Sequence, residues 1–196
     1  MNYLKFFNDT ETTGVDERIH QIHQIGLILT DPTTNTILET ADIKMRIDEK
    51  FIVHADADGM AKSNVTIDQI MANPYSQKEG YDYLISILEK HINRYDRADK
   101  AQFIAYNSPF DERFIRQLFL NQNDNYFGSW FWNPTICVMR AAAWFVQEHR
   151  GDFPNFRLET LCRIAGIEFD EEKAHDGFYD IEKTIEFYRF LTQKTT

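Results

Sequence analysis

The chain has 196 residues, of which 43% are hydrophobic and 27% charged, and its formal net charge is −10. This balance is typical of a folded protein and excludes a disordered chain, and the length fits a single domain over residues 1–196. The acidic charge argues against a protein that holds long duplexes on a broad basic surface, because nonspecific nucleic-acid affinity comes mainly from neutralised phosphates.

The cellular location can be predicted from targeting signals and cysteine usage. The N-terminal segment MNYLKFFNDTETTG lacks the apolar core of a signal peptide, and no stretch approaches the roughly 18 apolar residues that span a bilayer. Cys137 and Cys162 lie far apart without a CxxC pattern, which favours free thiols in a reducing compartment. We therefore expect a cytoplasmic protein with no membrane partner.

The first part of the chain contains three segments of β-rich composition, which predict strands: residues 3–7, 20–30 and 37–47. A turn at residues 32–35 joins the second and third, which indicates a β-meander. Thr66 is expected to cap a short helix. Ser76 and Glu79 form a capping box that opens a longer amphipathic helix.

The second part alternates between strand and helix. Residues 102–106 are an apolar run of strand length, and Pro109 stands where the first turn of a helix tolerates proline. The aromatic stretch 125–133 is expected to be a loop. Helices are predicted over three later segments: residues 135–146, 158–165 and 175–191. This order indicates an α/β fold, a mixed sheet flanked by helices.

Candidate functional residues first occur where the first predicted strand ends. Residues two apart in a strand project from the same face, so Asp9 and Glu11 can share one metal ion. Thr12, Thr13 and Gly14 follow with small side chains and backbone amides that suit the close approach of a nucleotide. A single DxE pair is more often a solvated turn, so this motif alone is weak.

A second candidate lies at the junction between the apolar run and the following helix, in the segment from Asn107 to Asp111 that includes Phe110. Open α/β sheets gather ligands at such an edge, so the Asp111 carboxylate can join the first pair. Its alternative role is that of an acidic residue in a first helical turn, which the helix dipole favours.

A third candidate opens the last predicted helix with the sequence HDGFYD. Asp176 and Asp180 are separated by one helical turn, and Asp180 can reach a metal ion while His175 approaches a water molecule. A lone histidine at a helix start is more often a surface or capping residue. A functional role for His175 is therefore supported only in combination with the other candidate residues.

Two further groups of residues are candidate ligands of a metal ion or of phosphate. His20 and His23 have an HxxH spacing, but on a strand they point to opposite faces, so we expect ordinary polar positions. Four basic side chains could contact phosphates, although surface salt bridges are their default role: Lys62, Arg113, Arg140 and Arg157.

The three carboxylate motifs, in this order, resemble those of the DEDDh exonucleases, a DnaQ-like family with a ribonuclease H-like fold. The resemblance is closest to the nuclease domain of bacterial exonuclease I and is carried by four segments: residues 7–12, 106–111, 138–141 and 156–159. It implies a mixed five-stranded sheet in one domain. The sequence departs from the family pattern at Gly177, where alanine is more usual.

The resemblance also implies an activity, the removal of nucleoside 5'-monophosphates from the 3' end of single-stranded nucleic acid, with DNA favoured over RNA and a role in DNA repair. It implies two Mg²⁺ ions, for which Mn²⁺ can substitute, and His175 as the general base. The implied metal ligands are Asp9, Glu11, Asp111 and Asp180. The implied substrate contacts are Thr12, Thr13, Gly14, Asn107 and Phe110.

Other functions remain open from the sequence. The chain could be a DEDDh exoribonuclease resembling oligoribonuclease or RNase T, or a proofreading exonuclease that works beside a polymerase. A rival of another class is a catalytically silent binding or scaffold protein that keeps only the fold. The five intact candidate residues argue against this last alternative, and metal-dependent turnover would discriminate.

Overall fold

The computed structural model of the protein describes residues 3–57, 60, 65–174 and 177–194. A five-stranded sheet with the order β3-β2-β1-β4-β5 forms its centre. The strands are β1 (Lys5–Thr12), β2 (Ile22–Thr30), β3 (Ile37–Lys44), β4 (Gln102–Ala105) and β5 (Ile136–Cys137). The first three pair antiparallel, whereas β4 is parallel to β1 and β5 is parallel to β4. The predicted mixed sheet flanked by helices is confirmed.

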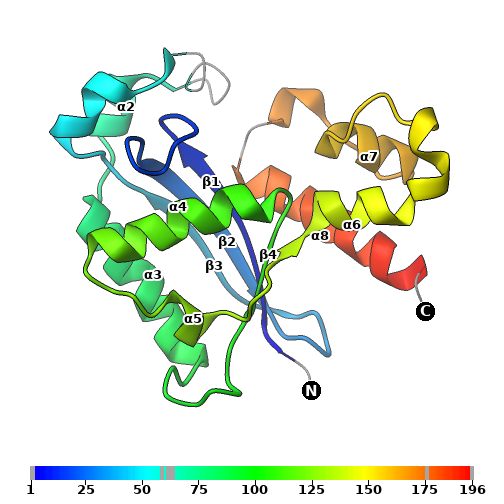
Figure 1. Cartoon of the computed structure of the whole chain (residues 1–196), viewed down its shortest axis with the longest axis horizontal. Coiled ribbons are helices and arrows are strands. Elements are labelled where there is room, and N and C mark those ends of the chain that lie inside the picture. Colours follow the sequence, from blue (N-terminus) through cyan, green and yellow to red (C-terminus); the bar gives the residue numbers. More distant parts are fainter. Residues whose placement is uncertain (1–2, 58–59, 61–64, 175–176, 195–196) are drawn as a thin grey trace.

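Helices cover both faces of this sheet, with α3, α4 and α5 on one side and α6, α7 and α8 on the other (Figure 1). The helices are α2 (Ile67–Met71), α3 (Gln77–His91), α4 (Ser108–Asn121), α5 (Phe127–Trp130), α6 (Val138–Phe145), α7 (Leu158–Ile164) and α8 (Gly177–Lys194). Three 3₁₀ turns complete the described elements: η1 (Glu49–His54), η2 (Gln147–Asp152) and η3 (Glu171–Lys173). No described helix is long and apolar enough to cross a bilayer.

Alternation along the central strands separates two hydrophobic cores. In β2, Ile25 and Leu27 face the core under α3 and α4, whereas Ile28 faces the core under α6 to α8. Phe6 and Phe7 of β1 divide in the same way. Each strand therefore presents one set of residues to each helical layer, as the period of two in a strand requires.

Local capping chemistry fixes two helix starts as the sequence predicted. The Thr66 side chain accepts a hydrogen bond from the Gln69 amide, and Ser76 accepts one from the Glu79 amide. In both cases the side chain at the third helical position binds back to the amide of the capping residue, so both are complete capping boxes.

Two expectations for the region after α4 were wrong. The stretch 125–133 is not a plain loop, because Phe127, Trp130 and Phe131 are buried in the core and form α5 and its exit. Residues 135–137 are not helical, since Ile136 and Cys137 form the edge strand β5 before α6 begins at Val138. Tertiary pairing with β4 overrides the local helical pattern there.

The parallel strands β1 and β4 place their carboxyl ends at one edge of the sheet. They pair from Lys5 to Phe7 and then separate. The buried Asn8 side chain donates a hydrogen bond of 3.1 Å to the Ile104 carbonyl where the strands part. This opening exposes the edge to which the predicted site residues belong.

Candidate active site

Asp9 and Glu11 lie on the face of β1 that is covered by α8. Asp9 pairs across the strands with Gly26, and Glu11 pairs with Gln24. Both carboxylates are half-buried. The predicted shared face is therefore present, and β2 supplies a glycine and an amide opposite the two acids.

Asp111 reaches the same region from the first turn of α4. One of its oxygens, Oδ1, accepts hydrogen bonds from the Thr10 amide at 3.0 Å and from the Thr10 hydroxyl at 2.9 Å. The Asp111 side chain is only 3% exposed. A helix-borne carboxylate is thus fixed to the strand residue that lies between Asp9 and Glu11.

Asp180 comes from α8, which approaches the sheet closely because β2 has a glycine beneath it. A Cβ atom on Gly26 would lie 2.8 Å from Ile181 Cδ1 and 3.6 Å from the Gly177 backbone. A Cβ atom on Gly177 would lie 3.8 Å from Asp9 Oδ2, so the start of α8 stands next to the β1 carboxylate. Small residues at both contacts allow this approach.

The four carboxylates influence one another electrostatically. Burial raises the pKa of Asp9 well above its usual value, and three neighbouring carboxylates raise it further: Asp111, Glu11 and Asp180. Burial also raises the pKa of Asp111 to about 7, against the opposing effect of its two hydrogen bonds from Thr10. Strong shifts caused by burial and by like charges are characteristic of functional sites.

The donor set fits a hard divalent cation. It consists of carboxylate oxygens, which Mg²⁺ and Mn²⁺ prefer, and both cysteines lie buried elsewhere. Among the residues that the structure describes, no group of three or more histidine, cysteine or acidic side chains is already arranged to hold a metal ion.

The loop after β1 is held together by internal hydrogen bonds. The Thr13 amide donates to the Gln21 carbonyl at 3.0 Å, and the Gln21 amide donates to the Thr13 hydroxyl at 3.1 Å. The Thr12 hydroxyl donates to the Gly14 carbonyl at 2.7 Å. The Thr13 amide is therefore occupied within the loop, unlike the exposed amide that the sequence suggested.

Gly14 is required by a close contact within this loop. A Cβ atom there would lie 2.4 Å from the His20 ring. His20 precedes β2, whereas His23 lies within it and is buried, so the two histidines occupy different environments. Burial lowers the pKa of His23 to about 4. That the two histidines do not bind a metal ion together stays a prediction. His23 is a buried residue of β2.

The remaining predicted residues are distributed around this edge. Asn107 is exposed at the start of α4, and Phe110 is half-buried with its ring 4.9 Å from that of Phe114. Arg113 forms the expected surface salt bridge, at 3.4 Å from Glu17. Two predicted residues lie outside the described part of the chain: His175 and Lys62.

A cavity of about 520 Å³ opens beside two of the carboxylates. Its described lining residues come from β1, the residue after β4, the start of α7, the two flanks of η3, and α8: Asp9, Tyr106, Arg157, Leu158, Glu159, Phe169, Ala174 and Asp180. Sequence reasoning assigned no role to Tyr106 or Phe169, nor to Thr10. Thr10 could have been suspected from its position inside the DxE motif, whereas the cavity depends on contacts distant in sequence.

The chain is similar to proteins named oligoribonuclease and ribonuclease T. The chain is 28% identical over 111 residues to an oligoribonuclease of Corynebacterium glutamicum, covering 56% of this chain and 49% of that protein. It is 21% identical over 199 residues to a ribonuclease T of Shewanella denitrificans, covering 98% and 81%. The chain thus spans about half the length of the first relative and most of the second.

Solved structures show the same fold. The chain superposes on E. coli exonuclease I in a zinc-bound complex with single-stranded DNA with a TM-score of 0.79 at 19% identity, covering 99% of this chain and 41% of exonuclease I. A family model described as Exonuclease, RNase_T, matches residues 6–188. With that match over most of its length, the chain belongs to this exonuclease family.

Proposed function

We propose that this protein is a metal-dependent 3'-5' exonuclease that hydrolyses phosphodiester bonds of single-stranded nucleic acid, with DNA as the favoured substrate. The observation that carries the proposal is the convergence of three carboxylates on Asp9, from Glu11 of β1, Asp111 of α4 and Asp180 of α8, which together with burial raise its pKa. Such a cluster is unfavourable without cations, and acidic oxygen sites are where two-metal phosphodiester hydrolysis takes place.

The proposed metal ligands are Asp9, Glu11, Asp111 and Asp180. Two divalent cations held by these oxygens would supply electrostatic stabilisation of the charge that develops on the phosphate and on the departing 3' oxygen. The protein itself orients these ligands. Thr10 holds Asp111 through two hydrogen bonds, and the close contact at Gly26 sets the distance between α8 and the sheet. Mg²⁺ is the proposed physiological ion, and Mn²⁺ is expected to substitute.

The substrate is proposed to place its terminal nucleotide against the loop after β1 and the start of α4. Thr12 and Gly14 would contact the nucleotide, with Thr13 shaping the loop from within. Phe110 is proposed to stack on a base and Asn107 to contact the chain end. Stacking tolerates any base, so we expect little sequence preference.

The general base is proposed on the sequence pattern alone, since His175 lies outside the described residues. An ordinary histidine titrates near pH 6.5. A neutral imidazole is needed to accept a proton from water, so activity should fall in acid.

RNA is the second candidate substrate. The relatives named oligoribonuclease and ribonuclease T favour it, whereas the structural likeness to exonuclease I concerns the fold alone. Discrimination between the sugars requires contacts to the 2' hydroxyl. The experiment must therefore offer both nucleic acids.

The test follows 5'-labelled single-stranded DNA and RNA of the same sequence, with Mg²⁺ or with chelator, for the wild type and Asp180→Asn. We expect a ladder that shortens from the 3' end of DNA, that disappears with chelator and that falls at least ~100-fold in Asp180→Asn. Asp82→Asn is the matched control, because Asp82 is an exposed carboxylate of α3 paired only with Lys78 among the described residues.

The other possible results of this cleavage assay distinguish the alternative functions. A ladder mainly with RNA would assign the protein to the ribonuclease branch of the family. Cleavage that persists in chelator, or that Asp180→Asn leaves intact, would contradict the carboxylate mechanism. Absence of cleavage of both nucleic acids would favour the binding or scaffold role.

A further inference from the structure

The cavity beside Asp9 and Asp180 lies on the α7 and α8 side of the carboxylates. Its lining does not include the loop after β1, nor Phe110 and Asp111 of α4. The site therefore has two sides, one facing α4 and one facing α7. The proposed terminal nucleotide occupies the first side, which leaves the cavity for another part of the strand.

The charges around the cavity are unequal. Among the lining residues that the structure describes, Asp9, Glu159 and Asp180 are acidic and Arg157 is the single basic one. Glu159 is paired with Arg163 of the same helix at 3.3 Å. Arg157 is exposed, and within the described ranges its guanidinium has no hydrogen-bond or ion-pair partner. The expected surface salt bridge is thus missing among the described residues, and the Arg157 guanidinium lies at the cavity without an ion-pair partner there.

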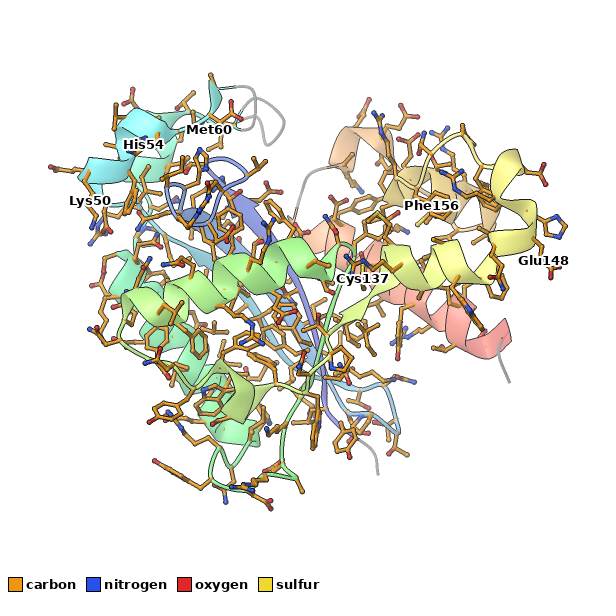
Figure 2. All side chains as sticks on the ribbon, in the orientation of Figure 1. Lys50, His54, Met60, Cys137, Glu148 and Phe156 are labelled. Carbon is orange, nitrogen blue, oxygen red and sulfur yellow. The ribbon has the colours of Figure 1, made fainter. Side chains whose placement is uncertain are left out.

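The backbone around Arg157 is held by contacts of Tyr106, Asn155 and Phe156. The Tyr106 hydroxyl donates a short hydrogen bond to the Phe156 carbonyl. Asn155 Oδ1 accepts from the Arg157 amide at 2.9 Å and from the Thr160 hydroxyl at 2.8 Å. The guanidinium of Arg150 covers the Phe156 ring at 4.4 Å. Figure 2 labels Phe156 among the side chains of the α6 and α7 region.

The walls of the cavity suit a flat ring. Tyr106, Leu158 and Phe169 line it with apolar surface. The Phe169 ring meets Tyr179 edge-on at 5.3 Å, and the Tyr179 hydroxyl accepts a hydrogen bond of 2.5 Å from the Asp170 amide. A volume of about 520 Å³ lies within the usual range for a small-molecule site with few polar groups.

We propose that this cavity binds the nucleoside on the 5' side of the scissile bond, and that Arg157 is a substrate-binding residue for the 5' phosphate of that nucleoside. The inference rests on the proposed function and deepens it. The planar guanidinium matches phosphate oxygens through two parallel hydrogen bonds, which a lysine cannot reproduce.

The direction follows from the layout of the site. If the scissile phosphate lies at the carboxylates and the terminal nucleotide lies on the α4 side, the next nucleoside extends over Asp9 and Asp180 into the cavity. Arg157 stands at the α7 wall of that cavity and is therefore placed to meet the following phosphate. The protein should consequently read one phosphate beyond the bond that it cleaves.

A pair of dinucleotides tests this directly. Thymidylyl-thymidine with a 5' hydroxyl contains only the scissile phosphate, whereas the 5'-phosphorylated form also contains the phosphate assigned to Arg157. For the wild type with Mg²⁺, we expect kcat/KM to be roughly tenfold or more higher for the phosphorylated form. Arg157→Ala should reduce this ratio to about one by lowering only the phosphorylated rate, and Arg157→Lys should restore it in part.

Arg97→Ala is the matched control. Arg97 is exposed in the loop that enters β4 at its amino end, whereas the carboxylates lie at the carboxyl end of the parallel strand β1. This variant removes the same charge and should keep the wild-type ratio. Equal rates for both dinucleotides in the wild type, or an equal loss on both in Arg157→Ala, would overturn the assignment.

A binding measurement separates this inference from the proposed activity. With Ca²⁺ in place of Mg²⁺, the affinity for labelled oligothymidylate is measured by anisotropy at several salt concentrations. Loss of one phosphate contact should reduce the slope of log affinity against log salt by about 0.7 in Arg157→Ala, and Arg97→Ala should not change it. An unchanged slope in Arg157→Ala contradicts the phosphate contact even if the enzyme is active. A wild type that binds but cleaves nothing contradicts the proposed function instead.

Discussion

Asp111 and Thr10 are joined by two hydrogen bonds that end on one oxygen, since Asp111 Oδ1 accepts both the amide and the hydroxyl of Thr10. Thr10 stands between Asp9 and Glu11 but points to the α4 side of β1. The strand therefore offers two acids on one face and fixes a third from the other. Positioning of Asp111 relative to Asp9 depends on this contact.

Replacing Thr10 with valine keeps the shape of the side chain and removes the hydroxyl donor. We expect a loss of roughly 10- to 100-fold in Mg²⁺ affinity or in kcat, the usual effect of removing a hydrogen bond that orients a metal ligand. Metal titrations of the nuclease rate and a thermal melt would measure both properties.

Thr30→Val is the control for that variant. Thr30 is a β2 residue that is 1% exposed, and its hydroxyl has no hydrogen-bond partner among the described residues. It should leave activity unchanged and should not lower the melting temperature. Equal behaviour of the two valine variants would show that the Thr10 hydroxyl does not orient Asp111.

The contribution of Asp111 to the stability of the metal-free protein should fall as the pH rises. The folded chain keeps the Asp111 proton until about pH 7, whereas the unfolded chain releases it near pH 4. The free energy of unfolding therefore decreases between these values. In chelator at pH 8, Asp111→Asn should melt roughly 5 °C or more above the wild type, and this difference should vanish near pH 4.

Mg²⁺ provides the complementary measurement. It should raise the melting temperature of the wild type at pH 8, because the cations neutralise the repelling carboxylates, and should raise that of Asp111→Asn much less. Asp82→Asn should behave as the wild type in both conditions. A wild type that melts at the same temperature with and without Mg²⁺ would argue against a metal site.

His23 should produce the opposite pH dependence. Burial, with a smaller effect from Lys44, lowers the pKa of His23 to about 4, so the folded chain resists a proton that the unfolded chain binds near pH 6.5. Stability is full above pH 6.5 and is lost as the pH falls towards 4. Compared with His23→Gln, the wild type should lose about 2 kcal/mol of unfolding free energy between pH 7 and 5.

Urea unfolding at both pH values measures this difference. His91→Gln is the control, because His91 is partly exposed and lies 3.4 Å from a Glu39 oxygen. Parallel curves for the wild type and His23→Gln would mean that His23 is protonated or solvated in the folded protein.

Gly26→Ala should impair activity without touching a carboxylate. The added Cβ would meet Ile181 Cδ1 at 2.8 Å and push α8, which carries Asp180, away from Asp9. Overpacking of this kind costs about 1 to 3 kcal/mol, and a displacement of about 1 Å can reduce the rate 100-fold.

The double variant Gly26→Ala with Ile181→Val removes the colliding methyl group. It should recover most of the lost activity, although Ile181→Val alone costs about 1 kcal/mol of stability. A double-mutant cycle of melting temperature and kcat gives the coupling. Additive losses would show that the two side chains do not collide.

Structural features that depend on a few neighbouring residues could be predicted from the sequence. The predicted cap at Thr66 and the predicted capping box at Ser76 located two helix starts, and the Asp9 and Glu11 spacing placed both acids on one face. The strand–helix junction at Asp111 likewise identified the sheet edge. Each of these follows from backbone geometry over a few residues.

Other features depend on contacts that distant segments make. β5 has only two residues and exists through pairing with Ile104 and Ala105, so no periodicity could reveal it. The aromatic residues of α5 look like a surface loop in sequence, yet Trp130 is fully buried. The cavity at Arg157 requires α7 to pack beside α8, which only the tertiary structure determines.

The hydrogen bonds between Thr13 and Gln21 affect how the loop after β1 would bind the 3' end of a nucleic acid. The Thr13 carbonyl also accepts the Asp56 amide at 2.7 Å, and the Gln21 side chain donates to Asp48 at 2.9 Å. Three segments are thus fastened together before any substrate arrives. Ordering one residue costs about 1 to 2 kcal/mol, so a preorganised loop leaves more of the contact energy for affinity. Docking of the proposed substrate at this loop is then a rigid-body event, with its rate limited by diffusion and orientation instead of by loop folding.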